Sequence, residues 1–124
     1  MDVTPLIPAD RQVIDSYGAG GFHVSGVAYA GAILVFPDGT LPWAVTALAE
    51  VTAESLAPVV ARGDIQILLL GCGRRMQPAA PALRQALRRA GIVVDAMDTG
   101  AACRTYNVLL AEDRRVAAAL LPAR

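Results

Sequence analysis

The stretch Ile65-Gln66-Ile67-Leu68-Leu69-Leu70, followed directly by Gly71-Cys72-Gly73, decides the fold of this chain. Its first part is almost entirely apolar, which is typical of a β-strand covered on both faces. A helical pattern follows from Pro78 or Ala79 to Ala90, with Leu83 and Leu87 one turn apart on its core face. The stretch therefore predicts a buried strand that leads through a glycine-rich loop into an amphipathic helix.

The rest of the second half repeats this alternation of strand and helix. Residues 92–97 form the next apolar strand, and Thr99-Gly100-Ala101 opens a helix that runs to about Ala111. Residues 116–121 read as a last strand, which ends before Pro122. Strands joined through a helix run parallel, so the second half predicts βαβ units.

The first half instead predicts an antiparallel β meander. Alternating apolar residues over 22–29 and a dense strand over 32–36 lead into a tight turn at Pro37-Asp38-Gly39-Thr40. Trp43-Ala44-Val45 is expected to be the returning strand. Residues 1–19 form an N-terminal arm that could add an edge strand.

A helix is expected between the two halves. Thr52-Ala53-Glu54-Ser55 offers a capping hydroxyl and an acid in the first turn, and Gly63 ends the helix. Pro58 fits the first turn if Ser55 is the cap, but not if the helix starts at Thr52. The predicted fold class is α/β: a compact three-layer single domain over residues 1–124, with a mixed β-sheet and two to three helices.

Composition narrows the range of functions. Of the 124 residues, 55% are hydrophobic, and 11 basic residues balance 11 acidic ones, so no overall attraction to nucleic acid is expected. Every basic residue is Arg, which excludes a Schiff-base lysine. Without a signal-like start or a long apolar run, a cytoplasmic protein with no transmembrane segment is expected. Its two cysteines are expected to be free thiols.

The parallel strands predict one candidate site. Gly71-Cys72-Gly73 and Asp98-Thr99-Gly100 would emerge at the same sheet edge, where α/β sheets usually bind ligands and where helix starts offer amide groups to an anion. The candidate ligand-binding residues are Gly71, Cys72, Gly73, Arg74, Thr99, Gly100, Cys103, Arg104 and Asn107. Two interpretations are open: a pocket for a small anionic ligand, or glycines that only make tight strand-to-helix turns.

The thiols leave a similar choice. Cys103 lies near a predicted helix start beside Arg104, and both features lower a thiol pKa; Cys72 could face it across the crevice. The pair could act in redox chemistry, or both could be buried small residues, since no histidine base is near in the sequence. His23, the only histidine, is expected to face solvent, and no catalytic residue, metal site or cofactor is predicted.

Four segments resemble a known family: Gly21-Phe22-His23-Val24-Ser25-Gly26, Val35-Phe36-Pro37-Asp38-Gly39, Gly71-Cys72-Gly73 and the run from Met97 to Asn107. They are similar to small domains of unknown function that include a mitochondrial respiratory complex I assembly factor and an adipogenesis-associated protein. The resemblance starts at about Tyr17 and implies a three-layer α/β fold with no established enzymatic activity.

The function predicted from the resemblance is a non-enzymatic protein-interaction or complex-assembly module from a bacterium. Its expected partner is a protein, which could belong to a membrane-associated complex, and a homodimer is compatible with this role. The alternative is an anion-binding or thiol redox protein that uses the crevice between the Cys72 and Cys103 loops.

Overall fold

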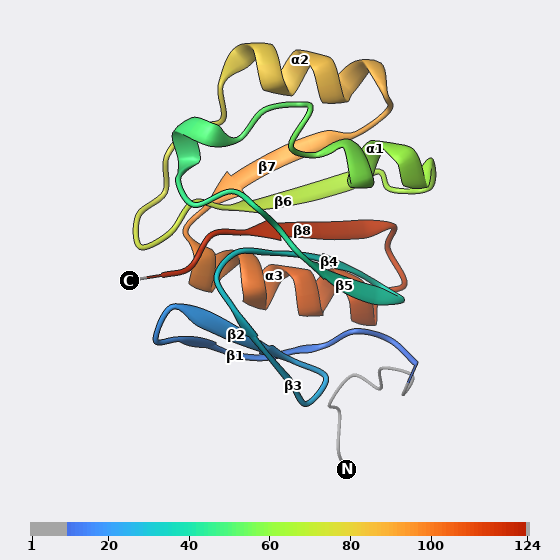
Figure 1. Ribbon diagram of the computed structural model, residues 1–124. Coiled ribbons are helices and arrows are strands. Elements are labelled where there is room, and N and C mark those ends of the chain that lie inside the picture. The colour runs from blue at the N-terminus through green and yellow to red at the C-terminus, as the bar shows by residue number, and fades with distance from the viewer. Residues whose placement is uncertain (1–9, 124) are drawn as a thin grey trace.

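The computed structural model describes residues 10–123, which form two β-sheets and three α-helices (Figure 1). In chain order the elements are β1 (Ile14–Gly18), β2 (Gly21–Val24), β3 (Val27–Ala30), β4 (Ile33–Phe36), β5 (Gly39–Pro42), a short 3-10 helix η1 (Leu48–Glu50), α1 (Ala57–Arg62), β6 (Ile67–Gly71), α2 (Pro81–Arg89), β7 (Val93–Met97), α3 (Thr99–Ala111) and β8 (Val116–Leu120).

The larger sheet has five strands in the order β5-β4-β8-β6-β7. Strand β6 pairs in parallel with both β7 and β8, which confirms the βαβ prediction for the second half. Strand β4 pairs antiparallel with β5 and with β8, so the sheet is mixed, as predicted. The fully buried strand β8 joins the two halves of the chain in one sheet.

The predicted antiparallel meander is confirmed for β1, β2 and β3, but it does not continue through β4 and β5, which belong to the other sheet. Strands β1, β2 and β3 form a separate antiparallel sheet with β2 in the centre. Gly31 stands between β3 and β4 with a φ of +78°, a left-handed conformation that glycine adopts freely. The chain turns there and leaves the small sheet for the large one.

The five-stranded sheet is covered on both faces, which gives the three predicted layers (Figure 1). One core cluster joins the sheet to the segment from Trp43 to α1 and to α2. The other joins the opposite face of the sheet to α3, and α3 in turn packs against the three-stranded sheet. Helix α3, which begins at the candidate site, is therefore held by contacts with both sheets.

Three predicted boundaries need correction. The returning strand is β5, not residues 43–45, because the turn at Pro37 and Asp38 lets Gly39 pair at once with Phe36. Trp43 is instead buried in a core cluster. Helix α1 starts only at Ala57, with Pro58 in its first turn, because Thr52 and Ser55 bond each other in a separate turn. Helix α2 starts at Pro81, later than predicted.

Helix α3 occupies the predicted residues, 99–111, and Leu83 and Leu87 are the buried positions of α2, also as predicted. Over residues 10–123, none of these helices has both the length and the apolar character that a bilayer crossing needs.

Candidate functional site

The carboxyl ends of β6 and β7 lie side by side, as the sequence predicted for the two candidate loops. Gly71 is the register partner of Met97, and the Cys72 amide donates a hydrogen bond of 2.9 Å to the Met97 carbonyl. One residue further on, the Thr99 amide donates to the Gly73 carbonyl at 2.8 Å. The two loops are therefore bonded directly to each other at the sheet edge.

The Thr99 side chain closes this junction. Its hydroxyl is fully buried, donates a 2.6 Å hydrogen bond to the Leu121 carbonyl and accepts a 2.8 Å hydrogen bond from the Gly73 amide. The Leu121 amide donates in turn to the Gly71 carbonyl at 3.0 Å. We call this set, made by Gly71, Gly73, Thr99 and Leu121, the β6–α3 junction. It ties the ends of β6 and β8 to the start of α3.

The junction leaves no room for a ligand next to Gly71. A Cβ atom placed on Gly71 would lie 2.9 Å from the Leu120 Cδ2 and 3.1 Å from the Thr99 Oγ1. Such distances are below ordinary van der Waals contact, so a side chain here would force its neighbours to shift. Glycine is needed at 71 because Thr99 and Leu120 fill the space that a side chain would occupy.

The start of α3 is also occupied by the protein's own groups. The Asp98 carboxylate accepts a 2.9 Å hydrogen bond from the Ala101 amide and caps the helix. Above Gly100 lies the side chain of Tyr17 from β1, placed so that a Cβ on Gly100 would overlap the Tyr17 hydroxyl. Several of the amides that an anion would need are thus engaged or covered. Tyr17 lies far from the loops in the sequence and was not among the predicted site residues.

Asn107 connects α3 to the small sheet. Its side-chain amide donates to the Ile14 carbonyl at 2.8 Å, and its oxygen accepts from the Ile14 amide at 3.0 Å. A single side chain thus satisfies both backbone groups of one residue in β1. Asn107, a candidate ligand-binding residue in the sequence, instead makes a long-range contact with β1.

A groove of about 370 Å³ runs along this seam between β1 and α3, lined by Ile14, Asp15, Ser16, Tyr17, Cys103, Arg104 and Asn107. Arg104 is exposed there, as is Arg74 in the loop after β6. The structure therefore divides the predicted site into two parts: the filled β6–α3 junction and an open groove that contains Cys103, Arg104 and Asn107.

The two cysteines do not face each other across a crevice, which rules out the redox pair among the two interpretations that the sequence left open. Cys72 belongs to the core cluster on the α1 and α2 side of the sheet, and Cys103 belongs to the cluster on the α3 side. The Cys72 thiol donates to the Gln77 carbonyl at 3.3 Å. Both thiols are free and buried, in agreement with the interpretation of two buried small residues.

Arg104 does lower the pKa of Cys103, as the sequence suggested, but the net shift of the pKa is upward. Burial raises the pKa of Cys103 from an ordinary value of 9.0 to about 12, and the nearby Arg104 charge only partly opposes this effect. Desolvation wins because a thiolate loses its hydration when it is 4% exposed among apolar neighbours. The thiol therefore stays protonated at neutral pH.

We expect Cys103 to react slowly with iodoacetamide in the folded protein. At pH 8.5, well below the pKa of about 12, the folded state holds almost no thiolate, whereas the chain unfolded in urea ionises near its ordinary value. Because the folded state binds this proton more tightly, its stability should also fall as the pH rises above about 9. Mass spectrometry of the Cys103 peptide gives the rate; comparable rates in the folded and unfolded chains would contradict this account.

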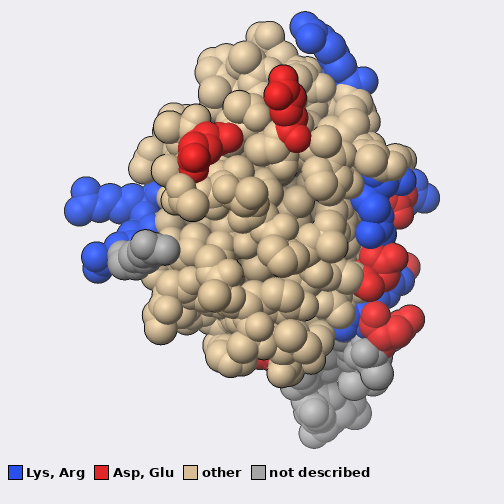
Figure 2. Space-filling view, viewed as in Figure 1, with Lys and Arg blue, Asp and Glu red and all other residues tan. Residues whose placement is uncertain are grey.

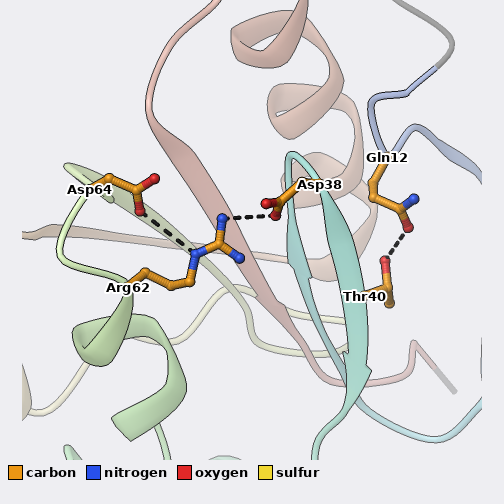
Figure 3. Close-up of polar contacts among 5 residues, drawn as sticks. All are labelled: Gln12, Asp38, Thr40, Arg62 and Asp64. Atoms are coloured by element: carbon orange, nitrogen blue, oxygen red, sulfur yellow. Dashed lines mark hydrogen bonds and ion pairs between the residues drawn. The ribbon is translucent and has the colours of Figure 1, made fainter.

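A second polar cluster, which the sequence did not predict, lies at the opposite end of the sheet (Figure 3). Arg62 from α1 contacts the carboxylates of Asp38 at 2.8 Å and Asp64 at 3.7 Å, and its guanidinium lies 4.7 Å from the centre of the Phe36 ring. The hydrogen bond from Arg62 lowers the pKa of Asp38. Because both ion pairs are largely exposed, they contribute little to stability. The pair between Arg62 and Asp38 connects α1 to the β4–β5 turn.

Two further titratable side chains, His23 and Tyr106, lie outside both polar clusters. His23 is exposed on β2, as predicted, with its Nδ1 3.3 Å from the Ser16 hydroxyl. Tyr106 is fully buried in the core cluster around α3, and burial raises its pKa well above the usual range. Over residues 10–123, its hydroxyl has no hydrogen-bond partner, and no three His, Cys, Asp or Glu side chains are grouped to hold a metal ion.

These observations define a small mixed-sheet α/β domain in which the two loops best placed to hold a ligand are bonded to each other. The chain belongs to the family described as a protein of unknown function (DUF498/DUF598), which matches residues 14–121. This result confirms the resemblance seen in the sequence.

Two relatives show how far the similarity extends. An uncharacterized protein of Rhodobacter capsulatus is 37% identical over 88% of this chain and 83% of its own length. The NADH dehydrogenase [ubiquinone] 1 alpha subcomplex assembly factor 3 of Xenopus tropicalis is 34% identical over 92% of this chain and 63% of its own length. The chain therefore spans somewhat less than two thirds of the length of that assembly factor.

Solved structures with the same fold support the assignment. A protein of Bartonella henselae, described as an outer membrane protein, has a TM-score of 0.86 and 39% identity, and covers 96% of this chain and 100% of its own. A Bordetella pertussis protein described as an Mth938-like domain has a TM-score of 0.82 and 33% identity, over 98% of this chain and 92% of its own. The three-layer α/β fold is thus that of the Mth938-like domains.

Proposed function

We propose that this chain is a non-enzymatic protein-interaction module that assists the assembly of a respiratory membrane complex. The observation that carries the proposal is the similarity to assembly factor 3, which extends over almost the whole folded region. The human assembly factor 3, for example, is 33% identical over 92% of this chain. The family match, over residues 14–121, includes both sheets and α3 rather than a single motif.

The geometry of the candidate site supports a role in binding rather than in chemistry. Two polar side chains of the predicted site, Thr99 and Asn107, are already hydrogen-bonded to the backbone. The Thr99 hydroxyl and the Asn107 side-chain amide each hold backbone segments together. The Cys103 thiol is buried and protonated. These groups therefore stabilise the fold and leave the surface as the part of the molecule that can recognise a partner.

A second candidate function is the binding of a small anion in the groove between β1 and α3. The observation that favours it is the exposed Arg104 beside a groove of about 370 Å³. Arginine can hold a carboxylate or phosphate through two hydrogen bonds. In this alternative, the side chain of Arg104 would be required for function, whereas in the assembly proposal it would not.

Gene deletion with rescue tests the proposal and separates the two candidates. In the organism that carries this gene, we expect deletion to reduce the amount of membrane NADH:ubiquinone dehydrogenase on native gels, while succinate dehydrogenase stays unchanged. Wild-type protein and the Cys103→Ala variant should both restore the enzyme, as should Arg104→Ala.

Two outcomes would contradict the proposal. An unchanged level of NADH dehydrogenase after deletion would remove the assembly role. Failure of Arg104→Ala to rescue, with its thermal unfolding temperature unchanged, would instead support anion binding at the groove. The deletion strain carrying the matched exposed variant Arg84→Ala on α2 controls for the loss of one surface arginine.

A further inference from the structure

The two sheets end in four edge strands: β1 and β3 in the small sheet, β5 and β7 in the large one. An edge strand presents unpaired backbone groups that can pair with another chain. Proteins that remain monomeric block such edges with a proline, an exposed charge or a covering element. The four edges of this chain can therefore be compared by what blocks each of them.

Three of the edges are blocked. Asn107 from α3 pairs with both backbone groups of Ile14 in β1. Strand β5 ends with Pro42, which has no amide hydrogen to offer at the edge. Strand β7 carries the exposed carboxylate of Asp95 in its centre.

Strand β3, at residues 27–30, has none of these devices. It contains no proline and no charged residue, Val27 is 53% exposed, and Ala28 and Ala30 are exposed as well. In the part of the chain that the structure describes, no covering helix packs on this edge as α3 does on β1. Strand β3 is thus the one described edge without protection.

The hydrogen-bond pattern of the small sheet shows which groups this edge presents. Val24 pairs with Val27 across a two-residue turn, and Phe22 pairs with Tyr29. The next backbone bond in the same direction, from the Gly31 amide to the Gly20 carbonyl, measures 2.9 Å. Antiparallel strands bond through alternate residues, so the amide and carbonyl groups of Ala28 and Ala30 point away from β2, toward the free edge.

The surroundings of this edge carry almost no charge. Residues 16–49 contain one charged residue, Asp38, whereas the whole chain has 22 (11 basic and 11 acidic). Figure 2 shows the result: the surface in front of β3 and β5 is almost entirely free of charged side chains, which lie above it and at its sides. A neutral surface does not repel a copy of itself, and it offers nothing to select an acidic or basic partner.

We propose that β3 pairs with β3 of a second copy of this chain, in an antiparallel arrangement around a two-fold axis. Ala28 and Ala30 of each copy would then exchange backbone hydrogen bonds, joining the two three-stranded sheets into one continuous sheet. A two-fold axis suits this edge because the same patch meets itself. The proposal does not depend on the assembly role, since either can hold without the other.

Sedimentation equilibrium over a wide concentration range tests the proposal directly. We expect a species of twice the 12.9 kDa chain mass that dissociates on dilution. Amide hydrogen exchange at Ala28 and Ala30 should slow as the concentration rises, because these amides become bonded only in the dimer. A protein that sediments as a monomer throughout, with rapid exchange at both amides, would overturn the proposal.

Two variants of one residue make the test specific. Ala28→Pro removes an amide hydrogen that does not bond to β2. We expect the dissociation constant of the dimer to rise by about tenfold or more. Ala28→Lys should have the same effect through like-charge repulsion across the axis, and it remains informative if the proline variant does not fold. Ala82→Lys, exposed on α2, is the matched control and should dimerise normally.

The variants also distinguish this interface from other routes to a dimer. Loss of the dimer in both Ala28 variants, with an unchanged circular dichroism spectrum, supports pairing through β3. A dimer that persists in both variants would show that the copies meet elsewhere and would contradict the proposal.

Discussion

Replacing Thr99 by valine should lower the free energy of unfolding by about 2–4 kcal/mol. Valine has nearly the shape of threonine, so packing is kept while the hydroxyl is lost. The partly buried Gly73 amide and the buried Leu121 carbonyl would then lose the hydrogen bonds of 2.8 Å and 2.6 Å that they make now. Urea unfolding, followed by circular dichroism, measures the change.

Thr99→Ser is the matched control for this prediction. Serine keeps the hydroxyl and loses only a methyl group, so the loss should be about 1 kcal/mol. If the valine variant were as stable as the wild type, the β6–α3 junction would contribute nothing to the fold. The buried threonine and the two glycines of the junction would then need another role, and ligand binding would be the first to test.

Replacing Asn107 by alanine should cost about 1.5–3 kcal/mol, because two hydrogen bonds to the Ile14 backbone are lost together. The effect should be concentrated in the small sheet, since Asn107 is the polar link between β1 and α3. Amide exchange in β1 and β2 should therefore accelerate more than in β6 or β8. Residue-resolved exchange monitored by NMR gives this comparison.

Two controls accompany the alanine variant. Asn107→Asp keeps an acceptor for the Ile14 amide but turns a carboxylate oxygen toward the Ile14 carbonyl, so at neutral pH it should destabilise the protein at least as much as alanine. Val108→Ala changes the neighbouring side chain, which is 56% exposed and should have little effect. Uniform acceleration of exchange across both sheets would mean that Asn107 supports the whole fold rather than the small sheet.

The second half of the fold could be predicted well because its signals are local. Two apolar strands on either side of an amphipathic helix indicate a βαβ unit, and α3 begins at the predicted residue, Thr99. The first half could not be predicted as fully. Nothing near β3 in the sequence shows that β4 pairs with β8 rather than with β3, since that choice depends on contacts across most of the chain.

The candidate site, like the fold, could be predicted only in part. The meeting of the Gly71 and Thr99 loops follows from parallel pairing and was predicted, because both loops leave neighbouring strands at one edge. What fills the space between them could not be predicted. Thr99 bonds to Leu121, and Tyr17 covers Gly100, through contacts between segments that are distant in the sequence.

The pKa of Cys103 illustrates why local reasoning alone fails at such a site. A helix start and a neighbouring arginine are both visible in the sequence, and both favour a thiolate. Burial is not visible there, because it arises when the small sheet and the large sheet both pack around α3. The desolvation that results is the larger effect, and it reverses the predicted direction.

The Gly71 and Thr99 loops at the carboxyl ends of β6 and β7 are bonded to each other and hold the fold together, and we propose that any partner is recognised elsewhere on the surface. Amide hydrogen exchange at Gly73, measured by NMR with and without phosphate and acetate, tests this most directly. We expect the Gly73 amide, bonded to the Thr99 hydroxyl, to exchange slowly, and neither anion to shift its resonance. Rapid exchange at Gly73, or a shift of the Gly73 and Gly100 resonances on adding an anion, would contradict it.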